Sequence, residues 1–133
     1  MSTQLTVQYA GRALPNTEQA GLGGPGLVRG YFLSVGSFDD AVVLRNELHG
    51  PSIGLPKASS ILGGVVPFAF IDVGYGRNYA MTARTRLASA GVGADVQVRR
   101  LAAASLNIVD AVVGSSKTRA GDWRLEASVN LVF

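Results

Sequence analysis

The sequence of 133 residues contains no cysteine and is poor in charge. Without cysteine, the chain can form neither disulfide bonds nor thiolate metal sites. Charged residues make up only 16% of the sequence, compared with about 25% in typical soluble domains. The net charge of +3 is small and comes from scattered cations without interleaved aromatic residues. The composition therefore gives no support to nucleic-acid binding.

A long apolar run is also missing. A transmembrane helix needs about 18–20 consecutive apolar residues, and the most apolar stretch, residues 61–73, is interrupted by glycine, proline and aspartate. The chain opens with a strand-like pattern and not with a basic and then apolar leader, so we expect any signal peptide to lie upstream. Low charge without a membrane helix leaves two classes: a soluble all-β core, or membrane strands whose two faces differ in polarity.

No set of catalytic or metal-binding residues stands out. His49 is the only histidine and has no serine–carboxylate partner at a suggestive spacing. Asp39 and Asp40 read as a turn, with a cation site as the alternative. Residues 21–26 formally match the dinucleotide fingerprint G-x-G-x-x-G, but a proline and a strand-like segment stand where that motif needs a helix. The sequence therefore predicts no enzyme, no cofactor and no metal.

Alternation of apolar and polar residues predicts an all-β fold. The expected strands lie at about residues 4–12, 41–49, 65–75, 87–99, 101–113 and 123–133, and a glycine-rich loop lies at about 13–33. The last strand is framed by Trp123 and Phe133, which suits a membrane strand of about 9–11 residues with aromatic girdles. A soluble sandwich strand shows the same alternation, so periodicity alone leaves both architectures open.

Six strands are too few for a closed membrane barrel, which needs at least about eight. An open sheet edge cannot face lipid, because its unpaired N–H and C=O groups would find no partners there. If these are membrane strands, the chain is therefore part of a larger barrel, or it pairs with other copies.

Two charged residues stand out from this background. Arg29 lies in the glycine-rich loop, and Asp72 lies inside the most apolar strand candidate. An aspartate in apolar surroundings is costly unless it is paired, and a guanidinium can bind a carboxylate through two hydrogen bonds. The candidate partners of Asp72 are a cross-strand cation such as Arg45 and the loop residue Arg29.

The segments around these two residues resemble a known transporter family. In chain order they are Leu14-Pro15-Asn16-Thr17-Glu18-Gln19, Leu22-Gly23-Gly24, Val28-Arg29-Gly30-Tyr31, Leu44-Arg45-Asn46-Glu47-Leu48, Phe70-Ile71-Asp72-Val73-Gly74 and the terminal Phe133. Together they are similar to the haemolysin secretion/activation (ShlB/FhaC/HecB) family of two-partner secretion transporters, in the BamA-like barrel superfamily. The resemblance runs in order over essentially the whole chain.

The resemblance implies an antiparallel transmembrane barrel of about 16 strands, of which this chain would supply the last six. In that family the sixth extracellular loop folds back into the pore, and its V-R-G-Y/F tip docks on a strand with the motif F-x-D-x-G. Carried across, Arg29 would pair with Asp72 inside the lumen. The loop motif would be Gly23, Gly24, Val28, Gly30 and Tyr31, the strand motif would include Phe70 and Gly74, and Phe133 would be the aromatic end read by the outer-membrane assembly machinery.

Within such a barrel, the charged sides of the strands would point into the lumen. They would form a mixed-charge wall suited to a passing extended chain. This facing rests on alternation alone, and the residues expected on the wall are Arg45, Glu47, Asp95, Arg99, Arg124 and Glu126.

The resemblance implies translocation of an unfolded exoprotein across the outer membrane of a Gram-negative bacterium. The expected partners are this exoprotein, the lipid bilayer, the assembly machinery, and the rest of the barrel with its POTRA domains. The POTRA domains, plug helix and earlier strands of the family have no counterpart in this sequence. The usual glycine after the aspartate of the family's G-D-x-G turn is also replaced, since Ala41 and Val42 follow Asp40. We therefore expect this chain not to transport alone. An assembly or insertase barrel of the same superfamily and a soluble β-sandwich binding module remain the alternatives.

Overall fold

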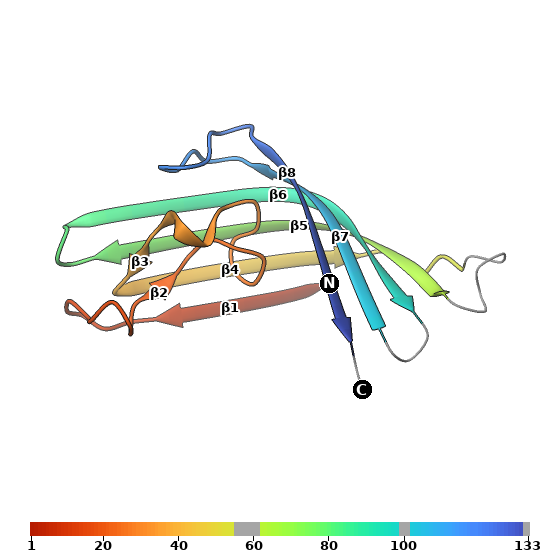
Figure 1. Cartoon of the computed structure of the whole chain (residues 1–133), viewed down its shortest axis with the longest axis horizontal. Helices are drawn as coiled ribbons and strands as arrows, with labels where there is room; N and C mark the ends of the chain where they lie inside the picture. The colour runs from red at the N-terminus through yellow and green to blue at the C-terminus, as the bar shows by residue number, and fades with distance from the viewer. Residues whose placement is uncertain (55–61, 99–101, 132–133) are drawn as a thin grey trace.

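The chain folds into one large antiparallel sheet whose strands are neighbours in nearly the order of the sequence (Figure 1). The computed structural model describes residues 1–54, 62–98 and 102–131. The sheet order is β1-β4-β5-β6-β7-β8, and two short strands, β2 and β3, pair with each other. The elements are β1 (Ser2–Gln8), β2 (Ala20–Gly21), the 3₁₀ helix η1 (Leu33–Val35), β3 (Ser37–Phe38), β4 (Asp40–His49), β5 (Leu62–Asn78), β6 (Ala83–Val98), β7 (Ala102–Ala111) and β8 (Trp123–Leu131). Within these residues, no helix is long and apolar enough to cross a membrane.

The expectation of an all-β, antiparallel chain is confirmed, whereas several strand ends differ from the sequence pattern. β1 ends at Gln8, before the expected residue 12, because the backbone of Ala10 and Gly11 turns to donate hydrogen bonds to the Asp40 carboxylate. β5 and β6 are longer than expected, with 17 and 16 residues. Their ladder continues to the pair Asn78 and Ala83, so the turn lies beyond the expected strand end at residue 75.

Strand register separates two faces of the sheet. One row of paired residues across the strands consists of Arg45, Asp72, Ser89 and Ala111. Another row, whose side chains lie on the opposite face, consists of Leu48, Ala69, Val92, Ile108 and Leu125. The second face carries a broad band of exposed apolar side chains. Members of that band that are more than half exposed are Leu5, Val7, Leu48, Ile71, Val92, Ile108, Trp123, Leu125 and Val129. Monomeric soluble proteins rarely expose an apolar surface of this extent.

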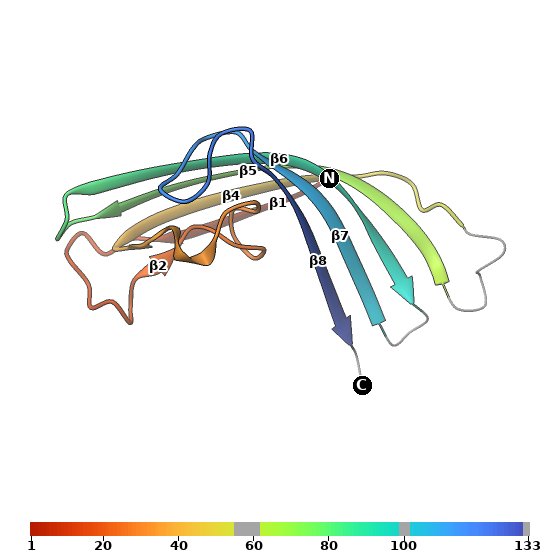
Figure 2. The same ribbon diagram turned by 45° about the horizontal axis from the view of Figure 1, so that its top comes forward.

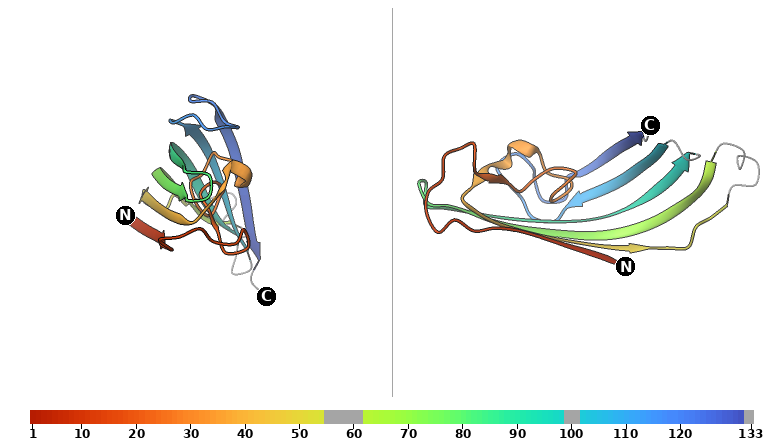
Figure 3. Two further views of the ribbon diagram at one scale, coloured as in Figure 1. Left: turned by 90° about the vertical axis from the view of Figure 1, so that its left-hand side faces the viewer. Right: turned by 90° about the horizontal axis from the view of Figure 1, so that it is seen from below.

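A long loop, residues 9–39, covers the other face of the sheet. Figures 2 and 3 show the sheet as an arch, with the loop on its concave side. The main hydrophobic core lies between the two: Leu22, Val28, Tyr31 and Phe38 of the loop pack with Ala41, Val43, Leu87 and Ala111 of the sheet. The core is thus closed by a loop, whereas a β-sandwich closes its core with a second full sheet.

The concave face leaves room for the loop because glycine stands where the loop approaches most closely. A Cβ atom added to Gly74 of β5 would lie 2.7 Å from Cγ2 of Val28, which is closer than carbon atoms pack. Val28 is fully buried at this contact. The pair Gly74 and Val28 therefore sets the distance between the loop and β5.

We expect Gly74→Ala to loosen the loop and to lower the stability of the folded protein by about 1–3 kcal/mol, the usual cost of overpacking. The measurement is the midpoint temperature of thermal unfolding of the protein in detergent. Adding Val28→Ala to Gly74→Ala removes the clashing methyl group and should recover part of the loss. Gly26→Ala is the matched control, because a Cβ atom there has no neighbour within 4 Å. Equal melting of Gly74→Ala and Gly26→Ala would contradict this description of the contact.

Candidate functional site

The centre of the concave face is a buried ion pair between the loop and β5. Arg29 donates from Nε to Asp72 Oδ2 at 2.6 Å and from Nη2 to Asp72 Oδ1 at 2.8 Å. The Arg29 backbone N–H also points to Asp72 Oδ2, at 3.3 Å. The Asp72 side chain is fully buried, and that of Arg29 is 4% exposed. The guanidinium thus meets the carboxylate in the two-pronged geometry that fixes both distance and orientation.

Two residues of β4 extend this pair into a network of four charges. Glu47 Oε1 accepts a hydrogen bond from Arg29 Nη1 at 2.7 Å. Arg45 lies beside both carboxylates, with Nη2 3.4 Å from Glu47 Oε1 and Nε 3.9 Å from Asp72 Oδ1. Both candidate partners of Asp72 are therefore near it, but only Arg29 makes the close contact. Glu47, one of the residues expected on the lumen wall, lies on the concave face and binds the loop arginine.

An aromatic ring supports the guanidinium from below. The Cζ atom of Arg29 lies 3.5 Å from the centre of the Phe70 ring, a cation–π distance. The ring in turn occupies the space opened by Gly91 on β6, where an added Cβ atom would lie 2.5 Å from Cζ of Phe70. Phe70 and Gly91 therefore set the depth at which Arg29 sits.

The cost of burying Arg29 explains why so many groups converge on it. Burial lowers the pKa of Arg29, but the hydrogen bonds and charge of Asp72, followed by those of Glu47, raise it above its ordinary value. Arg29 therefore keeps its positive charge. A buried charge that loses its partner typically costs about 3–5 kcal/mol, so the docked loop depends on the carboxylates around Arg29.

The two residues after Arg29 are held by other strands. Gly30 has φ of 81°, a conformation that glycine adopts readily, and its N–H donates to Glu126 Oε1 of β8 at 2.9 Å. The Tyr31 hydroxyl lies 2.6 Å from the carbonyl oxygens of both Ala88 and Val113. The tip of the loop thus contacts β4 and β5 through Arg29, β8 through Gly30, and β6 and the segment after β7 through Tyr31.

The remaining loop-motif residues shape the path that leads to this tip. Gly23 packs against the backbone of Phe32, where no side chain would fit. Gly24 has φ of 122°, and its N–H donates to the carbonyl of Val28 at 3.0 Å. These contacts close residues 22–28 into a compact turn in front of Arg29.

A second anchor, at the two ends of the loop, was not predicted from the sequence. Asp39 is fully buried, and its carboxylate accepts hydrogen bonds from the backbone of Leu14 and Tyr79 and from the side chain of Gln19. Asp40 accepts hydrogen bonds from the Tyr79 hydroxyl and from the backbone at residues 10 and 11. These carboxylates therefore tie the start of the loop to the β5–β6 turn. Only the placement of two aspartates directly before an alternating strand hinted at this role.

With their oxygens engaged by N–H and O–H donors, the two aspartates have little capacity left for the cation that was the alternative interpretation. In the part of the chain that the structure describes, no group of three or more His, Cys, Asp or Glu residues is placed to hold a metal ion.

The other charged residues expected on the inner wall divide into two groups. Arg124 and Glu126 of β8 contact the loop: Arg124 Cζ lies 3.8 Å from the centre of the Phe32 ring, and Glu126 binds Gly30. Asp95 of β6 lies on the concave face away from the loop tip, 3.7 Å from the His49 side chain. Arg99 and Phe133 fall outside the described residues.

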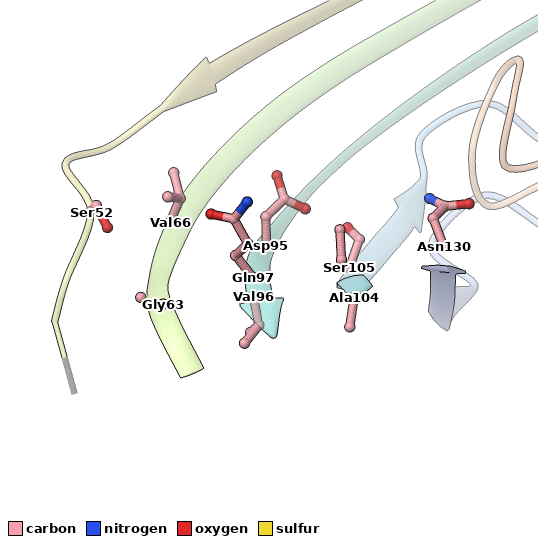
Figure 4. A pocket seen from close by; sticks show the side chains of 11 residues that line it. Ser52, Gly63, Val66, Asp95, Val96, Gln97, Ala104, Ser105 and Asn130 are labelled. Carbon is pink, nitrogen blue, oxygen red and sulfur yellow. The ribbon is translucent and has the colours of Figure 1, made fainter. Parts of the chain in front are cut away.

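A cavity of mixed lining lies around Asp95, toward the end of the sheet that the loop leaves free. It has a volume of about 350 Å³ and is lined by residues that include Ser52, Asp95, Gln97, Ser105 and Asn130. Figure 4 shows Asp95, Gln97 and Asn130 on one side of the curved strands and Val96 and Ala104 on the other. This end of the concave face offers hydrogen-bonding groups next to apolar ones.

The Asp39 anchor gives the protein a defined response to acid. Hydrogen bonds from the backbone N–H groups of Tyr79 and Leu14 lower the pKa of Asp39 below its ordinary value of 3.8. Its contribution to stability is therefore complete above about pH 4 and is lost as the pH falls through the lowered pKa. We expect Asp39→Asn to melt at a lower temperature than the parent protein at pH 7, and the difference to shrink below pH 4. A difference that stays constant down to pH 2 would contradict the assignment.

Comparison with known proteins identifies the family. The model of the family described as haemolysin secretion/activation protein ShlB/FhaC/HecB matches residues 1–96. The matched range contains the loop, β1, β4, β5 and most of β6, and so includes both Arg29 and Asp72. No match to the chain is found among curated proteins or among solved structures. The family match covers well over half of the sequence, and the chain therefore belongs to the haemolysin secretion/activation protein ShlB/FhaC/HecB family, whose members are outer-membrane transporters of Gram-negative bacteria.

Proposed function

We propose that this chain forms the C-terminal part of an outer-membrane pore that translocates an unfolded exoprotein to the cell surface. The observation that carries the proposal is the loop that folds onto the concave face of the sheet and is held there by the buried pair of Arg29 and Asp72. Membership of a two-partner secretion family supports transport of a protein as the function. The proposed activity is passage of a chain through a polar lumen and involves no bond chemistry.

The two faces of the sheet support a position in a membrane. The convex face exposes apolar side chains such as Leu48, Val92 and Val129, while the concave face holds the buried charges and the loop. This matches a membrane barrel, in which lipid-facing apolar residues alternate with polar interior residues. The convex face would lie against the bilayer, and the concave face would line the lumen.

The edges of the sheet support a larger barrel. Among the described residues, β1 pairs only with β4, and β8 pairs only with β7. Their outer edges carry backbone groups that cannot be left unpaired in lipid. We propose that further strands, in a barrel of about 16, close the sheet from β8 round to β1. The POTRA domains and these strands would be partners of the chain, and the terminal Phe133 would be the signal to the assembly machinery.

Secretion is favoured over the assembly or insertase role by the family model itself, which describes secretion and activation proteins. Both branches of the superfamily would share the arginine–aspartate pair, so that pair does not separate them. The alternative of a soluble sandwich module is disfavoured by the family match and by the loop that closes the core.

The contacts of the loop narrow the part of the wall that an exoprotein would meet. Arg45, Glu47, Arg124 and Glu126 are engaged by the loop or by the ion network. Asp95 and its polar neighbours Gln97 and Asn130 lie outside those contacts. We propose that an extended exoprotein segment first meets the end of the concave face around Asp95. It reaches the ion network around Arg29 only when the loop moves.

Charge reversal tests the pair directly. We expect Arg29→Glu and Asp72→Arg each to reduce secretion by at least about tenfold in the transporter that contains this chain, because each places like charges in contact inside a buried site. The measurement is the amount of exoprotein in the culture medium relative to the amount of folded transporter in the outer membrane. Arg119→Glu, at an exposed position between β7 and β8, is the matched control. Normal secretion by both reversal variants would remove the pair from the mechanism.

Cysteine labelling tests the facing of the strands. The chain has no native cysteine, so single substitutions report cleanly. We expect Asp95→Cys and Asn130→Cys to react with a water-soluble maleimide in intact membranes, and Val92→Cys and Val129→Cys to react slowly because they face lipid. The reverse pattern would invert the facing. Equal reaction of all four in detergent serves as the control for access to each thiol.

A further inference from the structure

We propose that Glu126 on β8 anchors the tip of the loop on the concave face. It positions Arg29 from β8, while Asp72 binds Arg29 from β5. The inference rests on the proposed function, since it concerns the same loop. It assigns Glu126 a specific task, whereas its place in the sequence pattern suggested only one charge among several on the wall. Glu126 acts through Gly30 and is therefore a positioning residue.

The geometry of the loop tip carries the proposal. Glu126 Oε1 accepts the N–H of Gly30 at 2.9 Å, across a separation of 96 residues. This N–H belongs to the peptide group that joins Arg29 to Gly30, so its direction fixes the plane of the peptide directly after Arg29. Gly30 also lies close to β7: an added Cβ atom would lie 2.7 Å from Cγ1 of Val109, so only glycine fits at this position. A hydrogen bond to this peptide therefore restricts the direction from which the Arg29 side chain leaves the loop.

The surroundings make the bond stronger than an exposed one. Glu126 and Arg29 line the same polar cavity of about 180 Å³, together with Arg45 and Glu47. The second carboxylate oxygen of Glu126, Oε2, is buried and has no hydrogen-bond partner among the described residues. A carboxylate that accepts a backbone N–H makes a charge-assisted hydrogen bond, which is stronger than a bond between neutral groups. Its negative charge also faces the cavity that holds the two arginines.

A second contact of the same strand points to the same task. The guanidinium of Arg124, two residues before Glu126, lies over the Phe32 ring at 3.8 Å. Gly30 and Phe32, the residues on either side of Tyr31, thus contact adjacent inward positions of β8. Asp72 and Glu47 hold the loop from β5 and β4, so the tip is attached to both sides of the concave face. Loss of either side would leave the other contacts intact and would let the tip pivot.

The experiment compares two side chains of similar shape at position 126 in the transporter that contains this chain. Glu126→Gln keeps an oxygen that can accept the Gly30 N–H, whereas Glu126→Met keeps the length and removes the acceptor. The reporter is Val28→Cys, at a loop position whose side chain is fully buried while the loop is docked, and the probe is a small water-soluble maleimide. Ser128→Ala, at the next inward position of β8, is the matched control.

We expect Glu126→Met to raise the rate of labelling at position 28 by about tenfold, the factor that corresponds to ~1.4 kcal/mol. Glu126→Gln should label at a rate between those of the parent and Glu126→Met, because it keeps the acceptor oxygen but loses the charge. Ser128→Ala should label within about twofold of the parent. The heat-modifiable fold should be the same in all four proteins. A parent-like labelling rate in Glu126→Met overturns the proposal. Faster labelling that accompanies loss of the heat-modifiable fold also overturns it, because Glu126 would then stabilise the barrel as a whole.

The outcomes also separate this inference from the proposed function. If Arg29→Glu abolishes secretion but Glu126→Met labels like the parent, the proposed pore function stands and the proposed role of Glu126 is wrong. If Arg29→Glu secretes normally while Glu126→Met still labels faster than Glu126→Gln, the anchor stands and the proposed function is wrong.

Discussion

The structure depends on one constraint: the positive charge of Arg29 is buried and must be neutralised where it lies. Removing a guanidinium from water is costly, and the cost is offset only when carboxylates and hydrogen bonds replace the lost hydration. Asp72 and Glu47 provide these groups, and the Phe70 ring covers the guanidinium from below. Because these partners belong to the sheet while Arg29 belongs to the loop, satisfying the charge also fixes the loop on the concave face.

The composition of the sheet follows from this arrangement. A loop that lies on a wall of strands needs space, and the strands under it provide the space by carrying glycine. Gly74 admits Val28, Gly76 admits Phe38, and Gly91 admits the ring that supports Arg29. The low charge of the whole chain has a related origin, since most convex side chains are apolar and the few inward charges are engaged with one another or with the loop.

Sequence reasoning reached the all-β fold because alternation with a period of two is a local property that any strand with two different faces must show. It singled out Arg29 and Asp72 because a lone aspartate in an apolar strand needs a partner, and the family resemblance named that partner. It did not reach the contacts of Glu47, Glu126 or Asp39. These depend on how the loop lies across the strands, and a contact between residues as far apart as Gly30 and Glu126 leaves no periodic signal. The expected strands also stopped short of the ends of β5 and β6. At Gly76, a residue type that often signals a turn, β5 in fact continues, and the glycine admits Phe38 of the loop.

The Tyr31 hydroxyl joins the loop inside the arch to the backbone of β6 and of the segment after β7. It lies between the backbones of Ala88 and Val113, just beyond Ser89 and Ala111, where the ladder between β6 and β7 ends. The phenol oxygen thus joins the two backbones beside the hydrogen bonds that Val112 and Val113 donate to the carbonyl of Ala88. Undocking of the loop would remove this bridge, so the end of the β6–β7 hairpin pairing is tied to the position of the inner loop.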